Sequence, residues 1–97
     1  MRREQVMTVL GSYFEEIRRR FGVVSLRLFG SVARDEAVSA SDIDILVDFG
    51  GPAGFSQYMD LLFFLEGLLG GSVDLVTVRG LRDELREDIQ REAIRVA

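Results

Sequence analysis

The sequence predicts a small α+β fold, with a mixed three-stranded sheet and helices packed mainly on one face. Three observations predict it. Apolar residues recur at helical spacing in several stretches, three short apolar runs between them have the length of strands, and glycines stand at their boundaries. A short connection joins the first two strand-like runs and a long helix joins the second to the third, which favours a mixed sheet. At 97 residues the chain has room for one core. Residues 1–97 are therefore expected to form a single domain.

The first helix is predicted from apolar residues that share one face, and Gly22 is expected to end it. These residues are Val6, Leu10, Phe14, Ile17 and Phe21. Arg18–Arg20 fall in the last turn, where positive charge complements the helix dipole. This arginine run has two interpretations, a solvated helix end or a contact with phosphate or RNA, and the first is favoured.

Residues 23–29 have the pattern of a strand, which Gly30 breaks. Ser31 is expected to cap a short helix that continues through about Ala37. After a loop, residues 42–49 predict the second strand, which ends at a glycine-rich turn.

Residues 56–69 predict a helix that is apolar over more than the roughly 100° arc that one core contact requires. Two interpretations stay open: a helix sandwiched between the core and loops, or a helix that also presents a protein interface. Residues 73–78 predict the third strand. A final helix has an apolar face formed by Leu81, Leu85, Ile89 and Ala93.

The composition excludes several kinds of chemistry. The chain has no cysteine and no histidine. Disulfides, cysteine nucleophiles and Ser-His-Asp catalysis are excluded, so any metal ligand or general base has to be a carboxylate. The net charge is −4. An acidic chain is a poor candidate for binding nucleic acid, so no direct nucleic-acid partner is expected. A signal-peptide core is absent and the longest apolar run is too short to cross a bilayer, so we expect no membrane partner and a cytoplasmic location.

Three aspartates form the candidate catalytic and metal-binding site. Alternation along the second strand puts Asp42 and Asp44 on one face, and Asp74 interrupts the apolar third strand. If these strands are neighbours in register, Asp74 joins the other two. Carboxylates about 4 Å apart repel by on the order of 4 kcal/mol per pair at an effective dielectric of about 20. One or two divalent cations would turn this repulsion into ligation, and all-oxygen ligands favour Mg²⁺, with Mn²⁺ as the alternative.

Gly30 and Ser31 are the candidate nucleotide-binding residues. Glycine lets the backbone approach a ligand closely, and the N–H groups at the start of a helix suit a phosphate. Arg34, one turn later, is expected either to reach a phosphate or to pair with a surface acid. Asp48 lies about 13 Å along the strand from Asp44 and is expected to be a solvated strand end. A phosphate-binding turn beside carboxylate-held metals is the arrangement that nucleotidyl or phosphoryl transfer needs.

Three motifs carry a resemblance to a known family. They are Leu28–Arg34 (LFGSVAR), Ser41–Val47 (SDIDILV) and Val73–Val76 (VDLV). Together they resemble the minimal nucleotidyltransferases of the DNA polymerase β superfamily. The resemblance covers nearly the whole chain, and the core motifs show no departure from the family pattern.

The resemblance implies a polymerase β-like nucleotidyltransferase fold and binding of ATP with Mg²⁺. It implies that Gly30 and Ser31 bind the triphosphate. It also implies that Asp42 and Asp44 hold the metals, while Asp74 completes the site and assists the attacking hydroxyl.

Many members of this family are antitoxins that transfer AMP to a tyrosine of a HEPN-domain toxin. The resemblance therefore implies a HEPN toxin as partner, in a hetero-oligomer. Two alternatives stay open. One is an antitoxin that neutralises its toxin by binding alone, and the other is a nucleotidyltransferase that modifies a small molecule or an RNA 3′ end.

Overall fold

The computed structural model describes residues 2–38 and 40–97, which contain four helices and four strands. In chain order these are α1 (Arg3–Phe21), β1 (Ser25–Phe29), α2 (Gly30–Ala33), β2 (Ile43–Asp48), α3 (Phe55–Leu69), β3 (Val73–Thr77), α4 (Asp83–Glu92) and β4 (Ile94–Arg95). The predicted alternation of helices and strands is confirmed as far as α4. The expectation of three strands is wrong, because β4 adds a short fourth strand at one edge.

The sheet is mixed, with the strand order β3-β2-β1-β4. β1 pairs antiparallel with both β2 and β4, whereas β2 and β3 run parallel. Helix α3 provides the long crossover that parallel neighbours need. Only Ile94 and Arg95 of β4 pair with β1. A strand of two residues has no alternation to read, so its pattern does not stand out in the sequence.

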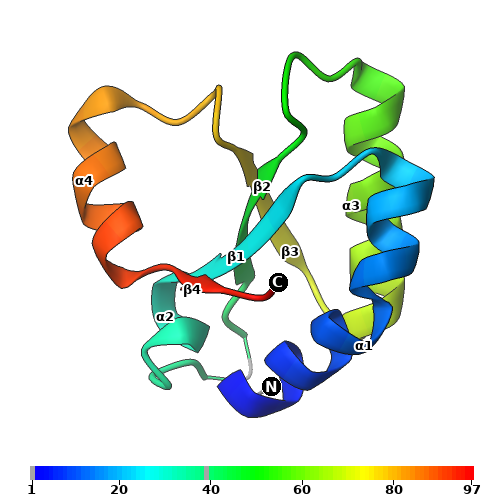
Figure 1. Cartoon of the computed structure of the whole chain (residues 1–97). Coiled ribbons are helices and arrows are strands. Elements are labelled where there is room, and N and C mark those ends of the chain that lie inside the picture. The colour runs from blue at the N-terminus through cyan, green and yellow to red at the C-terminus, as the bar shows by residue number, and fades with distance from the viewer. Residues whose placement is uncertain (1, 39) are drawn as a thin grey trace.

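Helices α1 and α3 pack together on one side of the sheet, while α2 and α4 lie on the other side in the view of Figure 1. The main core fills the layer between the sheet and the two long helices. Its buried residues include Leu10 and Ile17 of α1, Leu26 and Leu28 of β1, Ile43 and Ile45 of β2, Leu61 and Leu65 of α3, and Val73 and Leu75 of β3. Because alternate residues of β2 and β3 point into this layer, Asp44 and Asp74 point away from it.

Helix α2 is shorter than predicted. It ends at Ala33 and does not continue to Ala37, and its N-cap residue is Phe29, so Ser31 is not the N-cap. The helix stops because Asp35 adopts a left-handed conformation with a φ of 60°. The N–H of Glu36 then closes the turn by donating to the carbonyl of Ser31 at 2.8 Å.

Helix α4 uses only part of its predicted apolar face. Leu81 is buried but precedes the helix, and Ala93 follows it. Within the helix, Ile89 is half-buried, whereas Leu85 is 45% exposed. The helix therefore lies against the rest of the molecule through its last turns more than through its first.

Helix α3 packs one face against α1 and β3. Leu61, Leu65 and Leu69 are buried, and several neighbours pack against the core at partial exposure. Phe55 and Phe63 nevertheless remain 80% and 61% exposed. Within the described residues, no helix combines the length and apolar character that crossing a membrane requires.

The arginine run at the end of α1 is a solvated helix end. Arg18 and Arg20 pair with Glu15 and Glu16 on the exposed side of the helix. The guanidinium of Arg20 also lies 4.9 Å from the centre of the Phe64 ring, and so links α1 to α3. Gly22 ends the helix in the left-handed conformation, as predicted.

Leu61 and Phe63 provide a test of how α3 is seated. Leu61→Ala is expected to lower the free energy of unfolding by about 2–5 kcal/mol, because Leu61 is fully buried. Phe63→Ala, on the exposed side of the same helix, should cost less than about 1 kcal/mol. Urea titration followed by circular dichroism measures both. An equal loss for the two variants would contradict the packing described.

Candidate active site

The starts of β2 and β3 bring three aspartates to one end of the sheet. Asp44 and Asp74 are register partners across the parallel pair, so their side chains leave the same face. Asp42 is exposed directly before β2. The N–H of Ile43 donates to the carbonyl of Ser72 at 2.9 Å, which ties the two strand starts together. The expectation that the two strands are neighbours in register is confirmed.

The carboxyl of Asp44 is difficult to ionise in this position. Burial is the largest cause, and the negative charges of Asp74 and Asp42 add to it, so the pKa of Asp44 rises from 3.8 to about 6. Arg34 acts in the opposite direction, with a smaller effect. The carboxylates of Asp74 and Asp42 are therefore each close enough to Asp44 to disfavour its negative charge.

The negative charge of Asp74 also affects Tyr58 of α3. Burial raises the pKa of its hydroxyl, and the charge of Asp74 raises it further. The hydroxyl donates its proton to the carbonyl oxygen of Leu75. Tyr58 is therefore held by the sheet and is not directed at the carboxylates as a nucleophile.

The donor set suits a hard divalent cation, because it consists of carboxylate oxygens alone. Across residues 2–38 and 40–97, no group of three acidic side chains is already gathered around one point as a metal cage. Asp42 and Asp74 are exposed, so their side chains can change rotamer without disturbing the core. The negative charges of Asp74 and Asp42 beside Asp44 would favour a divalent cation at this end of the sheet.

Gly30 lies directly against Asp44. Its φ is 74°, in the left-handed region that favours glycine. A Cβ atom at this position would lie 2.0 Å from Oδ2 of Asp44, closer than any side chain allows. Sequence reasoning assigned Gly30 to ligand approach, and the structure adds that glycine is needed to leave room for a site carboxylate. Ser31 follows it, half-buried in the first turn of α2.

Arg34 pairs with two acids. Its Nε donates to Glu36 at 3.1 Å, and its Nη1 donates to Glu92 at 3.0 Å. These two partners raise the pKa of Arg34, Glu36 more than Glu92. Of the two expected roles for Arg34, pairing with surface acids is the one that the structure contains.

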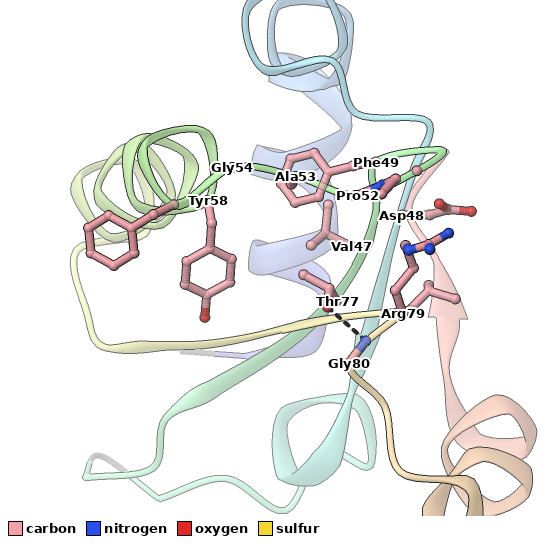
Figure 2. Close-up of a pocket in the computed structure, with 13 residues that line it drawn as sticks. Val47, Asp48, Phe49, Pro52, Ala53, Gly54, Tyr58, Thr77, Arg79 and Gly80 are labelled. Carbon is pink, nitrogen blue, oxygen red and sulfur yellow. Dashed lines mark hydrogen bonds between the residues drawn. The ribbon is translucent and has the colours of Figure 1, made fainter.

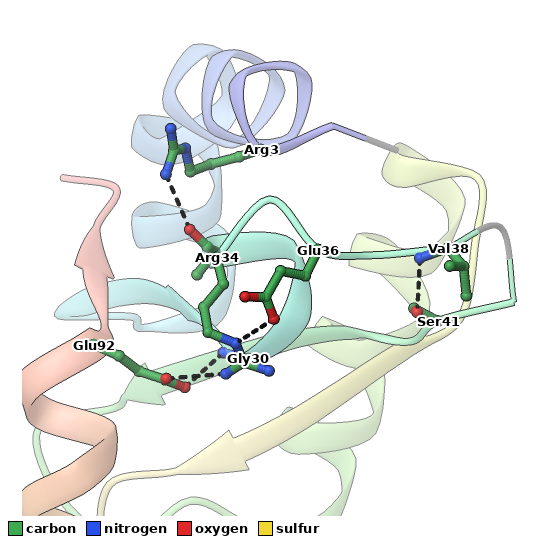
Figure 3. A network of polar contacts seen from close by, with 8 residues as sticks. Arg3, Gly30, Arg34, Glu36, Val38, Ser41 and Glu92 are labelled. Carbon is green, nitrogen blue, oxygen red and sulfur yellow. Dashed lines mark hydrogen bonds and ion pairs between the residues drawn. The ribbon is translucent and has the colours of Figure 1, made fainter.

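Glu92 is a site residue that sequence reasoning missed. Its Oε1 accepts the backbone N–H of Gly30 at 3.0 Å, while its other oxygen binds Arg34 (Figure 3). It lies 62 residues after Gly30 in the sequence, in a charged helix where one glutamate resembles another. Only the fold identifies it.

Asp48 is the last residue of β2 and accepts the N–H of Gly50 at 2.7 Å, as a turn residue. It borders a cavity of about 460 Å³ formed by the ends of β2 and β3, the loop at 49–54 and the start of α3 (Figure 2). This cavity is at the far end of the strands from Asp44 and Asp74. A smaller cavity of about 260 Å³ borders Asp42.

Residues 10–96 match the family model described as "Nucleotidyltransferase domain". The chain belongs to the nucleotidyltransferase domain family. Protein adenylyltransferase MntA of Thermococcus cleftensis is 39% identical to this nucleotidyltransferase over 93 residues, which make up 96% of this chain and 94% of that protein. Membership of this family makes the chain an enzyme of the nucleotidyltransferase class.

Solved structures show the same fold. One, described as a "putative minimal nucleotidyltransferase", is 42% identical and has a TM-score of 0.82 over 97% of this chain and 95% of that one. A chain from the complex of tri-AMPylated Shewanella oneidensis HEPN toxin with MNT antitoxin has a TM-score of 0.69. It is 20% identical and covers 94% of this chain and 71% of that one, a likeness of fold. The predicted nucleotidyltransferase fold is therefore confirmed.

Gly30→Ala tests the close approach of the backbone to Asp44. The added Cβ meets the carboxylate at 2.0 Å, and the left-handed backbone costs a further ~1 kcal/mol or more. We expect nucleotide transfer to fall by about 100-fold, since a displacement of about 1 Å at a reacting centre has that effect. Gly11→Ala in α1 is the matched control, because a Cβ there meets nothing within 4 Å. That variant should keep full activity; equal activity of both variants would contradict the role of Gly30.

Asp44→Asn tests the raised pKa. Because the folded-state pKa of about 6 exceeds the ordinary value of 3.8, the contribution of Asp44 to stability is fully present below pH 3.8 and is lost as the pH rises through 6. Asparagine cannot ionise, so the variant should be more stable than the wild type at pH 7.5 by about 1 kcal/mol, allowing for screening by water. The difference should shrink towards pH 4.

Thermal melts of the wild type and Asp44→Asn between pH 4 and 7.5 measure this difference, with Asp48→Asn as control. Millimolar Mg²⁺ should raise the melting temperature of the wild type and leave Asp44→Asn much less affected. A difference that stays constant across the pH range would contradict the assignment.

Proposed function

We propose that this nucleotidyltransferase is an antitoxin that transfers AMP from ATP to a tyrosine hydroxyl of a HEPN toxin, as a single minimal domain. The observation that carries the proposal is the register pairing of Asp44 with Asp74 beside Asp42 and the Gly30 turn. The likeness to the adenylyltransferase MntA, at 39% identity over nearly the full length of both chains, supports the choice of AMP. The fold of a chain from a complex of a tri-AMPylated HEPN toxin supports the choice of partner.

Asp42, Asp44 and Asp74 would hold two Mg²⁺ ions, or Mn²⁺ in their place. Such ions supply charge stabilisation at the triphosphate and lower the pKa of the attacking hydroxyl. Gly30 and Ser31 would bind the triphosphate through the turn that opens α2.

The reaction forms a bond between the acceptor oxygen and the α-phosphorus of ATP. It breaks the bond from that phosphorus to the bridging oxygen, so pyrophosphate leaves. The hydroxyl proton passes to a carboxylate, for which Asp74 is the candidate because it is exposed at the strand start, and then to water. Arg34 would add positive charge near the leaving pyrophosphate with the N–H groups that Glu36 and Glu92 leave available.

A protein acceptor suits the open position of the carboxylates. Asp42 and Asp74 are exposed, and Asp44 is half-buried. The net charge of −4 disfavours an RNA acceptor. A hydroxyl carried on another folded protein can reach such an exposed site, which is compatible with a toxin as acceptor.

The test uses the purified chain, a HEPN protein encoded beside it, labelled ATP and Mg²⁺. Label should pass to a tyrosine of the HEPN protein and be lost when that tyrosine is changed to phenylalanine. Asp42→Asn should lower the rate by about 100-fold or more. Asp48→Asn is the matched control, because it sits on the same strand away from the site and its amide oxygen can still accept the Gly50 N–H.

Three results would contradict the proposal. Absence of label on the HEPN protein, with Asp42→Asn behaving like the wild type, would exclude the reaction. Neutralisation of the toxin by an Asp42→Asn/Asp44→Asn double variant would favour an antitoxin that acts by binding. Label on an aminoglycoside or an RNA 3′ end, and none on protein, would reassign the acceptor.

A further inference from the structure

Glu92 connects the end of α4 to the proposed nucleotide-binding turn. One carboxylate oxygen accepts the N–H of Gly30 and the other accepts Nη1 of Arg34, each at 3.0 Å (Figure 3). Both partners are residues that sequence reasoning assigned to the nucleotide. A single side chain therefore bridges two elements of the proposed phosphate site.

The position of Glu92 is fixed from both sides along the chain. On one side, the N–H of Ala93 donates to the carbonyl of Ile89 at 2.8 Å, so Glu92 ends a closed helical turn. On the other side, Ile94 pairs with Leu28 of β1, only two residues before Gly30. The short β4 strand thus serves to place the carboxylate of Glu92 beside the turn.

The chemistry of the two contacts calls for a carboxylate. No side chain from α2 or its flanks caps the first turn of this helix, so the N–H of Gly30 depends on an acceptor from elsewhere. A neutral acceptor would satisfy that N–H, and only an anion satisfies it and pairs with Arg34 as well. A negative charge is otherwise unfavourable beside the proposed triphosphate. We attribute the acid at position 92 to its two contacts, with the N–H of Gly30 and with Arg34.

The bridge orders two features at once. It holds the left-handed Gly30, whose backbone lies against Asp44. It also directs Arg34, which uses two of its five N–H donors on Glu36 and Glu92 within the described part of the chain. Arg34, held by these two acids, keeps further N–H donors for an incoming anion.

We propose that Glu92 is a positioning residue for nucleotide transfer, which holds the Gly30–Ser31 turn and Arg34 in place relative to Asp44. The inference rests on the proposed function, because that function assigns the turn and Arg34 to the triphosphate. Glu92 touches no reacting atom in this scheme. Its effect should appear in the rate of transfer more than in the affinity for nucleotide.

The experiment compares Glu92→Ala and Glu92→Gln with the wild type in three measurements. These are hydrogen exchange of the Gly30 amide by NMR, binding of a non-hydrolysable ATP analogue with Mg²⁺ by calorimetry, and single-turnover AMP transfer to the HEPN protein. Glu87→Ala is the matched control, since Glu87 lies on the same helix and, among residues 2–38 and 40–97, pairs with a neighbouring exposed arginine alone. Circular dichroism checks that each variant is folded.

Glu92→Ala should speed exchange of the Gly30 amide by about 10-fold, which corresponds to the loss of one hydrogen bond. It should lower the transfer rate by about 100-fold, while the dissociation constant for the analogue changes by less than about 5-fold. Glu92→Gln keeps an oxygen for the Gly30 N–H and loses the charge facing Arg34. It should recover about 10-fold of the lost rate. Glu87→Ala should match the wild type in all three measurements.

Two outcomes would overturn the inference. One is a transfer rate for Glu92→Ala within 2-fold of the wild type, or a Gly30 amide that stays as protected as before. The other is analogue binding more than 10-fold tighter in Glu92→Ala, which would make Glu92 a competitor of the triphosphate. If the wild type itself transfers no AMP to the HEPN protein, the proposed function fails separately. The exchange and binding measurements would still decide whether Glu92 orders this turn for a nucleotide.

Discussion

The parallel pairing of β2 with β3 is the constraint on which the site depends. It places Asp44 opposite Asp74, and burial together with the negative charge of Asp74 raises the pKa of Asp44. Parallel pairing needs a long crossover, which α3 supplies while it also covers the core face. The helix that shields the apolar side of the sheet is thus the same segment that brings the two acidic strand starts together.

The second constraint is the lack of space between Gly30 and Asp44. The antiparallel pairing of β1 with β2 ends with Phe29 opposite Asp44. The chain therefore enters α2 at Gly30, next to the carboxylate of Asp44. A four-residue helix follows, and it is too short to be stable by itself. Its position is supported by packing of Val32 in the core and by the carboxylate of Glu92. The proposed nucleotide-binding turn is therefore held by the core through Val32 and by α4 through Glu92, and does not depend on its own short helix.

Much of the fold and the site could be predicted because the relevant signals are local or periodic. The apolar spacing of α1 and α3, the alternation in β2, and the aspartate in β3 are all visible in short windows of sequence. The expectation that Asp74 would join Asp44 required only that two predicted strands be neighbours in register. Strand alternation then determined the direction of both side chains.

The features that sequence reasoning missed have no local signal. β4 has two residues, too few to show a period. The early end of α2 depends on a left-handed Asp35, a conformation that aspartate tolerates but that its presence in a sequence does not predict. Glu92 acts on Arg34 across 58 residues, and its sequence neighbours are charged residues of similar character.

The alternation of side chains along β3 has one more consequence. If the pairing of β3 with β2 slipped by one residue, Asp74 would turn into the layer beneath α1 and α3, while Val73 and Leu75 would turn towards water. An isolated charge in that layer is very unfavourable, so the acidic group itself disfavours a sheet in the slipped register. The carboxylate of Asp74, which is repelled by Asp44 in the native sheet, thus also disfavours the one-residue slip of β3 against β2.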